Sequence, residues 1–332
     1  MIKVTVGRND AGQRFDRFLR KYLKNAPLSV IYRIIRKDAK VNGKRAHRDT
    51  GLAEGDEISL YISSEDFSKF TEKKKSDERP PKRTFGIIYE DDNILVVNKP
   101  AGLLIHGNAA EKRDTLVNQV TDYLIKKGDY SPRAEKTFSP AAVNRLDRNT
   151  SGLVLFGKNS ESLRELAAMI RERGCIEKHY LTIVKGVYSG PQVLRGTVTK
   201  DENKNRVSVG AAGDSGRPIE TGVALAAAGD GVSLLDIDLV TGRTHQIRAH
   251  LASAGYPLAG DSKYGDPEFN SLMRRRFGLN GQFLHAYRLT VNKAGDPLKY
   301  LTGRTFISKL PKALEKTADA LFGTEWEKLY RQ

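Results

Sequence analysis

The sequence is poor in cysteine and tryptophan, with one of each in 332 residues. The single cysteine, Cys175, excludes an internal disulfide and lacks the Cys-x-x-Cys spacing of a zinc site. Six histidines are present, but none belongs to a His-Glu-x-x-His pattern, and the five-residue spacing of His245 and His250 places them on different sides of a helix. We therefore expect no bound metal.

Long apolar segments are also missing. No run of about 18 apolar residues occurs that could cross a membrane as a helix. The first residues do not combine a positively charged start with an apolar core, as a signal peptide would. We expect a soluble, cytoplasmic protein with no membrane partner.

Negative charge is in short supply. The chain has 40 Asp and Glu against 56 Lys and Arg, which gives a formal net charge of +16. Such an excess is typical of proteins that bind polyanions, and nucleic acid is the leading candidate partner. An anionic membrane surface is the alternative, although the missing apolar segments argue against it. The length is sufficient for one large domain and one small domain, each with its own core.

The first 62 residues have the pattern of a small basic domain. Apolar residues at positions 15, 18, 19, 22 and 23 recur on one helical face, and the rest of that segment is largely basic. A second helical run covers residues 30–37. The Asn42-Gly43 pair predicts a tight hairpin turn, and residues 57–62 predict a strand.

Two short basic helices and a basic hairpin resemble the S4 RNA-binding domain, which contacts structured RNA through its shape and phosphates. A basic face that is merely solvated is the alternative. The resemblance implies RNA contacts from Arg14, Arg17, Arg33, Arg36 and Lys44. Residues 63–84 have few apolar groups and a Pro-Pro step, so we expect a charged flexible linker that lets the small domain search for RNA independently.

The most informative segment is residues 144–155, where Asp147 lies between Arg145 and Arg148 just before an apolar strand. A carboxylate flanked by cations stays charged at neutral pH, so it can act as a nucleophile or a base but hardly as an acid. An ordinary polar turn is the alternative. The segment closely resembles the His-Arg-Leu-Asp-x-x-Thr-Ser-Gly-Leu signature of RNA pseudouridine synthases of the RluA type, in which this aspartate is catalytic.

Two later segments match the same family in the same order. Residues 178–184 predict a strand, and in the family the tyrosine of this Lys-x-Tyr motif, Tyr180 here, stacks on the target uracil. A core tyrosine is the alternative. Residues 242–251 contain the motif Gly-Arg-Thr-His-Gln-x-Arg, with Thr244 as the expected helix cap. The family's arginine, Arg248 here, pairs with the catalytic aspartate; a surface arginine is the alternative.

The same resemblance implies further contacts with RNA. Arg145 is expected to help occupy the space of the flipped base or to hold its flipped conformation. Lys99, in an Asn-Lys-Pro-Ala-Gly turn typical of the family, is expected to approach the RNA backbone; a purely structural turn role is equally compatible with its sequence. The other candidates are Arg148, Lys178 and Arg243. Asn144 departs from the family, which usually has histidine there.

Short strands and helices mix in no strict alternation after residue 85, which favours an α+β fold over a doubly wound sheet. Residues 85–310 are expected to form the synthase catalytic domain, with a mixed, largely antiparallel sheet, after the small α/β S4 domain. Residues 311–332 are expected to form a helical tail, whose role the sequence leaves open. The weaker family matches at 260–265 and 283–289 are expected to shape the core.

The implied activity is the conversion of uridine to pseudouridine in structured RNA. The chain looks most like bacterial enzymes of the RluC and RluD kind, which modify large-subunit ribosomal RNA. The reaction breaks the N1–C1′ bond, turns the uracil and rejoins it through C5, so no cofactor is required. Asp147 could attack C1′, add to C6 or act as a base, and the sequence does not separate these routes. The base must also leave its stack.

Two other functions are compatible with the sequence. One is an RNA-binding assembly factor with a synthase fold that has lost its activity. The other is an enzyme that hydrolyses the glycosidic bond and releases free uracil. The sequence does not identify the uridine that is modified, and it requires neither a protein partner nor more than a monomer.

Overall fold

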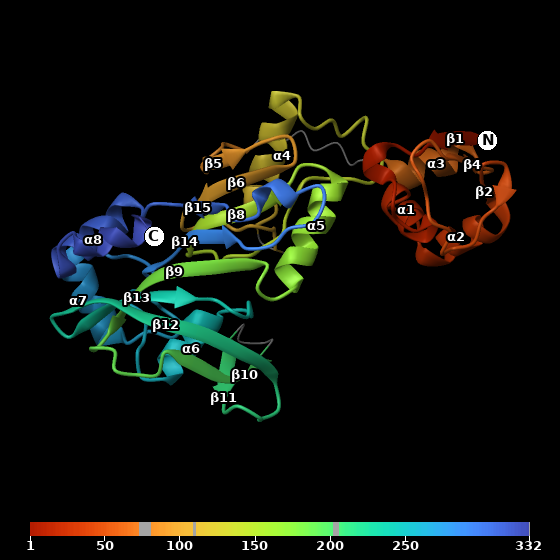
Figure 1. Ribbon diagram of the computed structural model, residues 1–332. Helices are drawn as coiled ribbons and strands as arrows, with labels where there is room; N and C mark the ends of the chain where they lie inside the picture. Colours follow the sequence, from red (N-terminus) through yellow and green to blue (C-terminus); the bar gives the residue numbers. More distant parts are fainter. Residues whose placement is uncertain (73–80, 109–110, 202–205, 332) are drawn as a thin grey trace.

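The computed structural model describes residues 1–72, 81–108, 111–201 and 206–331. An N-terminal unit and a larger unit built on one long sheet are seen in Figure 1. The N-terminal sheet has the order β1-β4-β2-β3, with antiparallel neighbours. Its strands are β1 (Ile2–Thr5), β2 (Ala39–Val41), β3 (Lys44–Arg45) and β4 (Glu57–Leu60).

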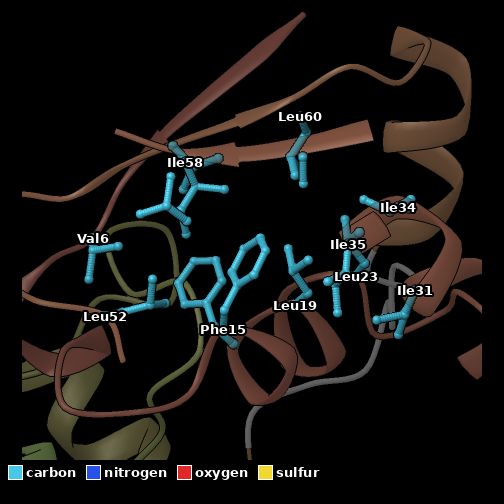
Figure 2. Packing of buried hydrophobic residues seen from close by; sticks show 14 of the residues in the cluster. Val6, Phe15, Leu19, Leu23, Ile31, Ile34, Ile35, Leu52, Ile58 and Leu60 are labelled. Carbon is cyan, nitrogen blue, oxygen red and sulfur yellow. The ribbon is translucent and has the colours of Figure 1, made fainter. Parts of the chain in front are cut away.

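Helices cover one face of this small sheet, as the apolar spacing predicts. They are α1 (Phe15–Tyr22), α2 (Leu28–Arg33), a π-helical continuation (Ile34–Asp38) and α3 (Ser64–Thr71), with a 3-10 turn at Arg8–Asp10. The buried side chains in Figure 2 come from both helices and strands; they include Phe15, Leu19, Ile34 and Ile58. Asn42 and Gly43 both have positive φ (51° and 74°), which confirms the hairpin turn.

The predicted linker began too early in the sequence. Residues 64–71 form α3, which is capped by the side chain of Ser63 as it accepts a hydrogen bond from the Asp66 amide. Phe70 packs into the N-terminal core and is only 9 % exposed. A single buried aromatic on a short polar helix gives little periodicity, so the sequence pattern missed it. Residues 73–80 of the predicted linker lie outside the described residues.

The larger unit contains an 11-stranded sheet in the part of the chain that the structure describes. The main path is β11-β10-β12-β13-β9-β14-β8-β6-β5, with β15 beside β14 and β7 beside β8. The pairing is antiparallel except between β14 and β8. This confirms the α+β prediction. The strands are β5 (Gly86–Glu90), β6 (Ile94–Lys99), β7 (Ala141–Ala142), β8 (Ser151–Gly157), β9 (Ile176–Lys185), β10 (Val193–Asp201), β11 (Arg206–Gly210), β12 (Arg217–Gly229), β13 (Val232–Asp238), β14 (Leu284–Val291) and β15 (Thr305–Ile307).

Helices pack on both faces of the large sheet. They are α4 (Leu116–Lys127), α5 (Ser160–Arg171), α6 (Gln246–Ser253), α7 (Pro267–Phe277) and α8 (Lys312–Phe322), with 3-10 turns at Lys299–Leu301 and Glu325–Arg331. The predicted tail is helical, and it belongs to the core of the larger unit. Trp326 is 1 % exposed and packs with Leu181 and Leu234 of the sheet.

The parallel pair β8 and β14 lies inside the sheet, between β6 and β9. Every residue of β8 is buried, and Gly152 has a φ of 116°, a conformation that favours glycine. A Cβ at this position would collide with the carbonyl oxygen of Ala286 on β14. Because β8 begins four residues after Asp147, this close approach fixes the base of the loop that carries the aspartate.

Candidate active site

The loop that carries Asp147 lies between β7 and β8. Beyond the end of β7, the side chain of Asn144 donates to the carbonyl of Leu153 (3.1 Å) and accepts from the amide of Leu155 (2.9 Å). The amide side chain thus continues the pairing with β8 where the backbone ladder ends. Asp147 follows in a turn closed by the Thr150 amide, which donates to the Asp147 carbonyl (3.1 Å).

Lys99 supports this loop from inside the protein. Its side chain is fully buried, and its Nζ donates to the carbonyls of Pro100 (2.9 Å), Leu103 (2.9 Å) and Arg148 (3.0 Å). Burial lowers the pKa of Lys99 to about 7, while the charge of Asp147 acts in the opposite direction. The predicted contact between Lys99 and RNA is therefore wrong. The structural alternative is correct, because the lysine ties its own turn to the catalytic loop.

Arg248 links Asp147 to a second carboxylate. Its Nη1 donates to Asp147 Oδ2 (2.8 Å), so the predicted pairing of these two residues is present. Its Nε and Nη2 donate to the two carboxylate oxygens of Asp261 (2.7 and 2.9 Å). The side chains of Arg248 and Asp261 are 8 % and 0 % exposed, whereas that of Asp147 is 25 % exposed. Arg248 thus lies buried between two carboxylates, and only one of them reaches solvent.

The charges in this chain of ion pairs reinforce one another. Burial acts to lower the pKa of Arg248, but Asp261 and Asp147 together raise it above its ordinary value. Burial acts to raise the pKa of Asp261, and the bonds from Arg248 and from the amides of Lys263 and Tyr264 hold it below its ordinary value. A buried guanidinium with two carboxylate partners is well compensated, so its geometry is fixed.

Sequence reasoning assigned Asp261 and Tyr264 only to the core, and it overlooked His245. The ring of Tyr264 lies 5.2 Å from the guanidinium carbon of Arg248. Its hydroxyl accepts from the amide of Val207 (2.8 Å) and lies 3.0 Å from Nδ1 of His245. The Nε2 of His245 is 4.0 Å from Asp147 Oδ2. The family-like segments at 242–251 and 260–265 contained the available sequence signal, since both place polar residues next to glycine.

The start of α6 differs from the prediction. The N-cap residue is His245 instead of Thr244, and it has the left-handed backbone angles φ 53° and ψ 18°. The side chain of Gln246 ties the preceding loop to the start of the helix, because its Oε1 accepts from the Arg243 amide (3.1 Å) and from the Thr241 hydroxyl (2.8 Å). The left-handed residue turns the chain so that both His245 and Arg248 face Asp147.

Tyr180 lies on β9, opposite Ile237 of β13 and Ala286 of β14. It is 4 % exposed, and burial together with the charge of Asp147 raises its pKa above the ordinary value. Tyr180 and Asp147 line one small cavity of about 50 Å³, which also contacts His245 and Arg248. The tyrosine therefore forms part of the wall beside the carboxylate.

A larger cavity of about 460 Å³ opens over Asp147. Asp147 is the one acidic residue among the described residues that line it. The Lys and Arg residues in its wall are Arg145, Arg148, Arg243, Arg248 and Lys263. The cavity thus presents one carboxylate within a strongly basic wall, which suits a polyanionic ligand.

The predicted RNA-contacting residues fall into three groups. Arg145 and Arg243 are exposed and line both cavities. Arg148 is exposed but forms an ion pair with Glu111 (2.9 Å). Lys178 is partly buried, which lowers its pKa, and it lines a neighbouring hollow of about 520 Å³ together with Arg243. The remaining predicted RNA-contacting residues lie on the N-terminal unit and line none of these cavities; they are Arg14, Arg17, Arg33, Arg36 and Lys44.

Of the N-terminal basic residues, Arg14 forms an ion pair with Asp16 (2.8 Å), and the others are exposed. Within the described ranges, no three His, Cys, Asp or Glu side chains are grouped closely enough to hold a metal ion. The same part of the chain has no helix with the length and apolar character needed to span a membrane.

Residues 93–253 match the family model described as RNA pseudouridylate synthase. The ribosomal large subunit pseudouridine synthase C of Escherichia coli (strain K12) is 35 % identical over 305 residues, covering 88 % of this chain and 89 % of the relative. The enzyme of the same name from Vibrio vulnificus (strain CMCP6) is 35 % identical over 293 residues, covering 85 % and 86 %. The solved structure of human RNA Pseudouridylate Synthase Domain Containing 4 is 20 % identical and similar in fold, with a TM-score of 0.55 over 70 % of this chain and 91 % of that one.

Proposed function

The chain belongs to the RNA pseudouridylate synthase family, and from this premise we propose that it isomerises specific uridines of large-subunit ribosomal RNA with Asp147 as the catalytic carboxylate. The observation that carries the proposal is the ion pair between Asp147 and the buried Arg248, at the floor of a basic cavity. The ribosomal substrate is that of the two relatives named above, which align with the chain over most of their length.

The geometry suits a carboxylate that reacts without being protonated. Arg248 is already paired with Asp261 through two bonds, so it holds Asp147 in place without adding an unbalanced buried charge. Only one oxygen of Asp147, Oδ2, accepts from Arg248, and the side chain remains 25 % exposed. The carboxylate therefore has an oxygen available to reach C1′, C6 or the C2′ proton of a flipped uridine, and each of these routes fits the arrangement.

The walls of the site suit an extruded nucleotide. Tyr180 provides an aromatic ring beside the carboxylate, and stacking of a base on such a ring contributes about 1–3 kcal/mol. Arg145 and Arg243 are exposed at the mouth and are placed to contact phosphates or to fill the space that the base leaves. Arg148 and Lys178 are less available to RNA, because Arg148 is paired with Glu111 and Lys178 is partly buried.

The N-terminal unit is proposed to bind a second part of the RNA as an S4-like domain. Arg17, Arg33, Arg36 and Lys44 are exposed on it, and the paired Arg14 lies at the start of α1. The expected setting is the cytoplasm, where ribosomal RNA is made and folded in bacteria. We propose that the protein acts as a monomer without an obligate protein partner.

The decisive experiment compares Asp147→Asn with the wild-type protein. Pseudouridine would be mapped by sequencing after carbodiimide treatment in large-subunit RNA incubated with each protein. We expect the wild type to modify one or a few uridines and Asp147→Asn to lose at least 10³-fold in rate, since removal of a group that reacts directly abolishes its step. The RNA dissociation constant should stay within about threefold, because Asp147 adds no attraction for phosphate.

The control is Asp92→Asn, an isosteric change at an exposed position far from the loop, which should retain wild-type activity. Free uracil among the products would favour glycosidic hydrolysis instead. Tight binding by wild-type protein with no modified uridine in ribosomal or transfer RNA would favour an assembly factor. Full activity of Asp147→Asn would remove the carboxylate from the mechanism.

A further inference from the structure

His245 lies beside the proposed catalytic carboxylate, and the roles of Asp147, Tyr180 and Arg248 leave its side chain unused. Its Nε2 is 4.0 Å from Asp147 Oδ2, which is beyond hydrogen-bond distance, and its ring lines both cavities of the site. Its backbone is in the left-handed region, at φ 53°. For a residue other than glycine this conformation is strained by about 1–3 kcal/mol, and such strain gathers at functional sites.

The bonds of Tyr264 determine which nitrogen of His245 carries the proton. The amide of Val207 donates to the Tyr264 hydroxyl oxygen (2.8 Å), which leaves the hydroxyl proton free to point elsewhere. Nδ1 of His245 lies 3.0 Å from the same oxygen. We assign the hydroxyl as the donor and Nδ1 as the acceptor, because the oxygen then accepts one bond and donates one. The proton of the neutral imidazole is consequently on Nε2.

The ring is held in the neutral form in which this assignment applies. Burial is the main cause that lowers the pKa of His245, and Arg248 and Lys263 lower it further, against the charges of Asp147 and Asp261. The ring also packs against Tyr264, with centroids 5.6 Å apart at an angle of 63°. A neutral N–H group is thus fixed in orientation and directed into the site.

We propose that His245 holds the uracil ring by donating a hydrogen bond from Nε2 to a ring carbonyl, and that the same bond guides the turn of the detached base. This inference rests on the proposed function. Half a turn of uracil about the line through N3 and C6 exchanges N1 with C5 and O2 with O4. A single fixed donor that binds O2 of the uridine therefore meets O4 of the product. The N1–C1′ bond breaks, the C5–C1′ bond forms, and in the net reaction the proton on C5 is replaced by one on N1.

A hydrogen-bond donor at this position stabilises the uracil most strongly while the base is detached from the ribose. If the base leaves as an anion, its negative charge is shared between N1 and the carbonyl oxygens, and a preorganised donor stabilises that charge. Arg248 is less suited to this part, because three of its five N–H groups are bonded to Asp147 and Asp261 and its side chain is only 8 % exposed. His245 combines a fixed orientation with a proton that points toward Asp147 and has no bonded acceptor among the described residues.

The test uses two substitutions that separate the donor from the backbone. His245→Asn places an amide at the position of Nδ1 and tolerates the left-handed conformation, but it has no donor at the position of Nε2. His245→Gln reaches the position of Nε2 with its amide and is less suited to the backbone. Single-turnover rates would be measured on a synthetic RNA fragment that contains a uridine modified by the wild type. We expect Gln to lose less than about 10-fold, and Asn and Ala to lose about 100-fold.

A second measurement changes the RNA instead of the protein. Replacing the target uridine by 2-thiouridine puts a poor acceptor in the place of O2, so the wild type should slow about 10-fold and His245→Ala should slow no further. His47→Gln, at an exposed position on the N-terminal unit, is the control. Equal rates for Asn and Gln, additive effects of the thio and Ala changes, or wild-type rates in Ala would each overturn the proposal. If the wild type modifies no uridine, the proposed function fails instead.

Discussion

At the residue scale, the site depends on a carboxylate, Asp261, that lines neither of its cavities. Asp261 is fully buried, binds Arg248 through two bonds and accepts the amides of Lys263 and Tyr264. Arg248 has one remaining bond, to Asp147. The direction in which Asp147 presents its second oxygen is therefore set by Asp261 through Arg248. Asp261 is a positioning residue, and its effect should appear in turnover more than in RNA binding.

Asp261→Asn tests this role. Asparagine keeps the shape but presents an amide N–H to a guanidinium, so one of the two bonds is lost and the buried charge is less well compensated. We expect the free energy of unfolding to fall by about 3 kcal/mol, as for a broken buried ion pair. We also expect the single-turnover rate at saturating protein to fall at least 100-fold with little change in the RNA dissociation constant. Urea unfolding, single-turnover rates and filter binding measure the three quantities.

The matched control for this change is Asp230→Asn. Asp230 is exposed, with a distant ion pair at 4.0 Å, and it has a positive φ that asparagine tolerates. Its stability and rate should equal those of the wild type. A wild-type single-turnover rate in Asp261→Asn would mean that Arg248 orients Asp147 without help from the second carboxylate.

The sequence predicted the reacting residues of the site better than their supports. Asp147, Tyr180 and Arg248 were selected because of their motif positions, and the structure brings all three to one cavity. Lys99 was misassigned, because nothing in the local sequence indicates that a lysine next to a proline donates to three carbonyls. Its partner carbonyl on Arg148 is 49 residues away, so the contact exists only in the folded chain.

At the scale of elements, the junction of β8 and β14 sets the position of the catalytic loop. His285 of β14 pairs with Ser151 of β8, and its Nδ1 lies 2.8 Å from the Ser151 hydroxyl. Its Nε2 lies 3.0 Å from the carbonyl of Ser308, so a neutral ring accepts at one nitrogen and donates at the other. The ring is fully buried and joins three segments at the level of the loop's base.

This junction should make the protein sensitive to acid. Burial lowers the pKa of His285 from 6.5 to about 4 in the folded state. Between these two values the unfolded chain binds more protons at this histidine than the folded chain does. The contribution of the neutral ring to the free energy of unfolding is therefore fully present above about pH 6.5 and is lost as the pH falls toward 4. A shift of this size corresponds to about 3 kcal/mol. His285→Gln cannot titrate, so we expect its free energy of unfolding to fall less steeply from pH 7 to pH 4.

Urea titrations of the two proteins at intervals of half a pH unit measure the two slopes. The Gln variant should be less stable than the wild type at pH 7, because its shorter amide does not reach both Ser151 and Ser308, and the difference should narrow in acid. Parallel curves for the two proteins would mean that His285 is not the group whose protonation destabilises the fold.

Element positions followed from periodicity where one face was strongly apolar. The first basic helix is found at Phe15–Tyr22, and the strands predicted at 57–62, after Asp147 and at 178–184 are found at Glu57–Leu60, Ser151–Gly157 and Ile176–Lys185. The prediction failed where a conformation depends on tertiary contacts. His245 replaces Thr244 as the cap of α6, and its ring is held by Tyr264, a partner 19 residues away that only the folded chain brings near.

At the scale of the whole molecule, the N-terminal unit is docked on the larger unit by polar contacts. Asp10 is 2 % exposed and accepts from the amide and the hydroxyl of Thr137 (2.9 and 2.7 Å). Asn9 accepts from the amide of Ser160 at the start of α5 (3.0 Å), and Arg8 forms an ion pair with Glu161 (3.0 Å). Figure 1 shows the N-terminal unit beside this end of α5.

The prediction that the small domain searches for RNA independently is therefore wrong for the conformation that the structure describes, in which the two units are in contact. The sequence could not indicate this contact, because its partners are ordinary polar residues in short turns more than 120 residues apart, as Asp10 and Thr137 are at a separation of 127. A docked unit fixes the distance between the basic helices and Asp147. RNA that contacts both units then gains from a defined spacing, which a flexible tether would not provide.

Asp10→Ala tests whether this docking matters for RNA selection. The change removes an acceptor that has two donors and leaves the Thr137 amide without its partner, which weakens the contact by about 1–3 kcal/mol. We expect kcat/KM to fall about 10-fold on large-subunit RNA, whose structure can contact both units. On a short stem-loop that contains only the target uridine, kcat/KM should be unchanged, since such an RNA reaches only the cavity over Asp147.

Asp49→Asn, at an exposed position on the same unit, is the control for a lost carboxylate and should match the wild type on both RNAs. Equal losses on the long and short RNAs would place the effect of Asp10 in the fold of the catalytic unit, and an unchanged rate on the long RNA would mean that the domains act without a fixed spacing.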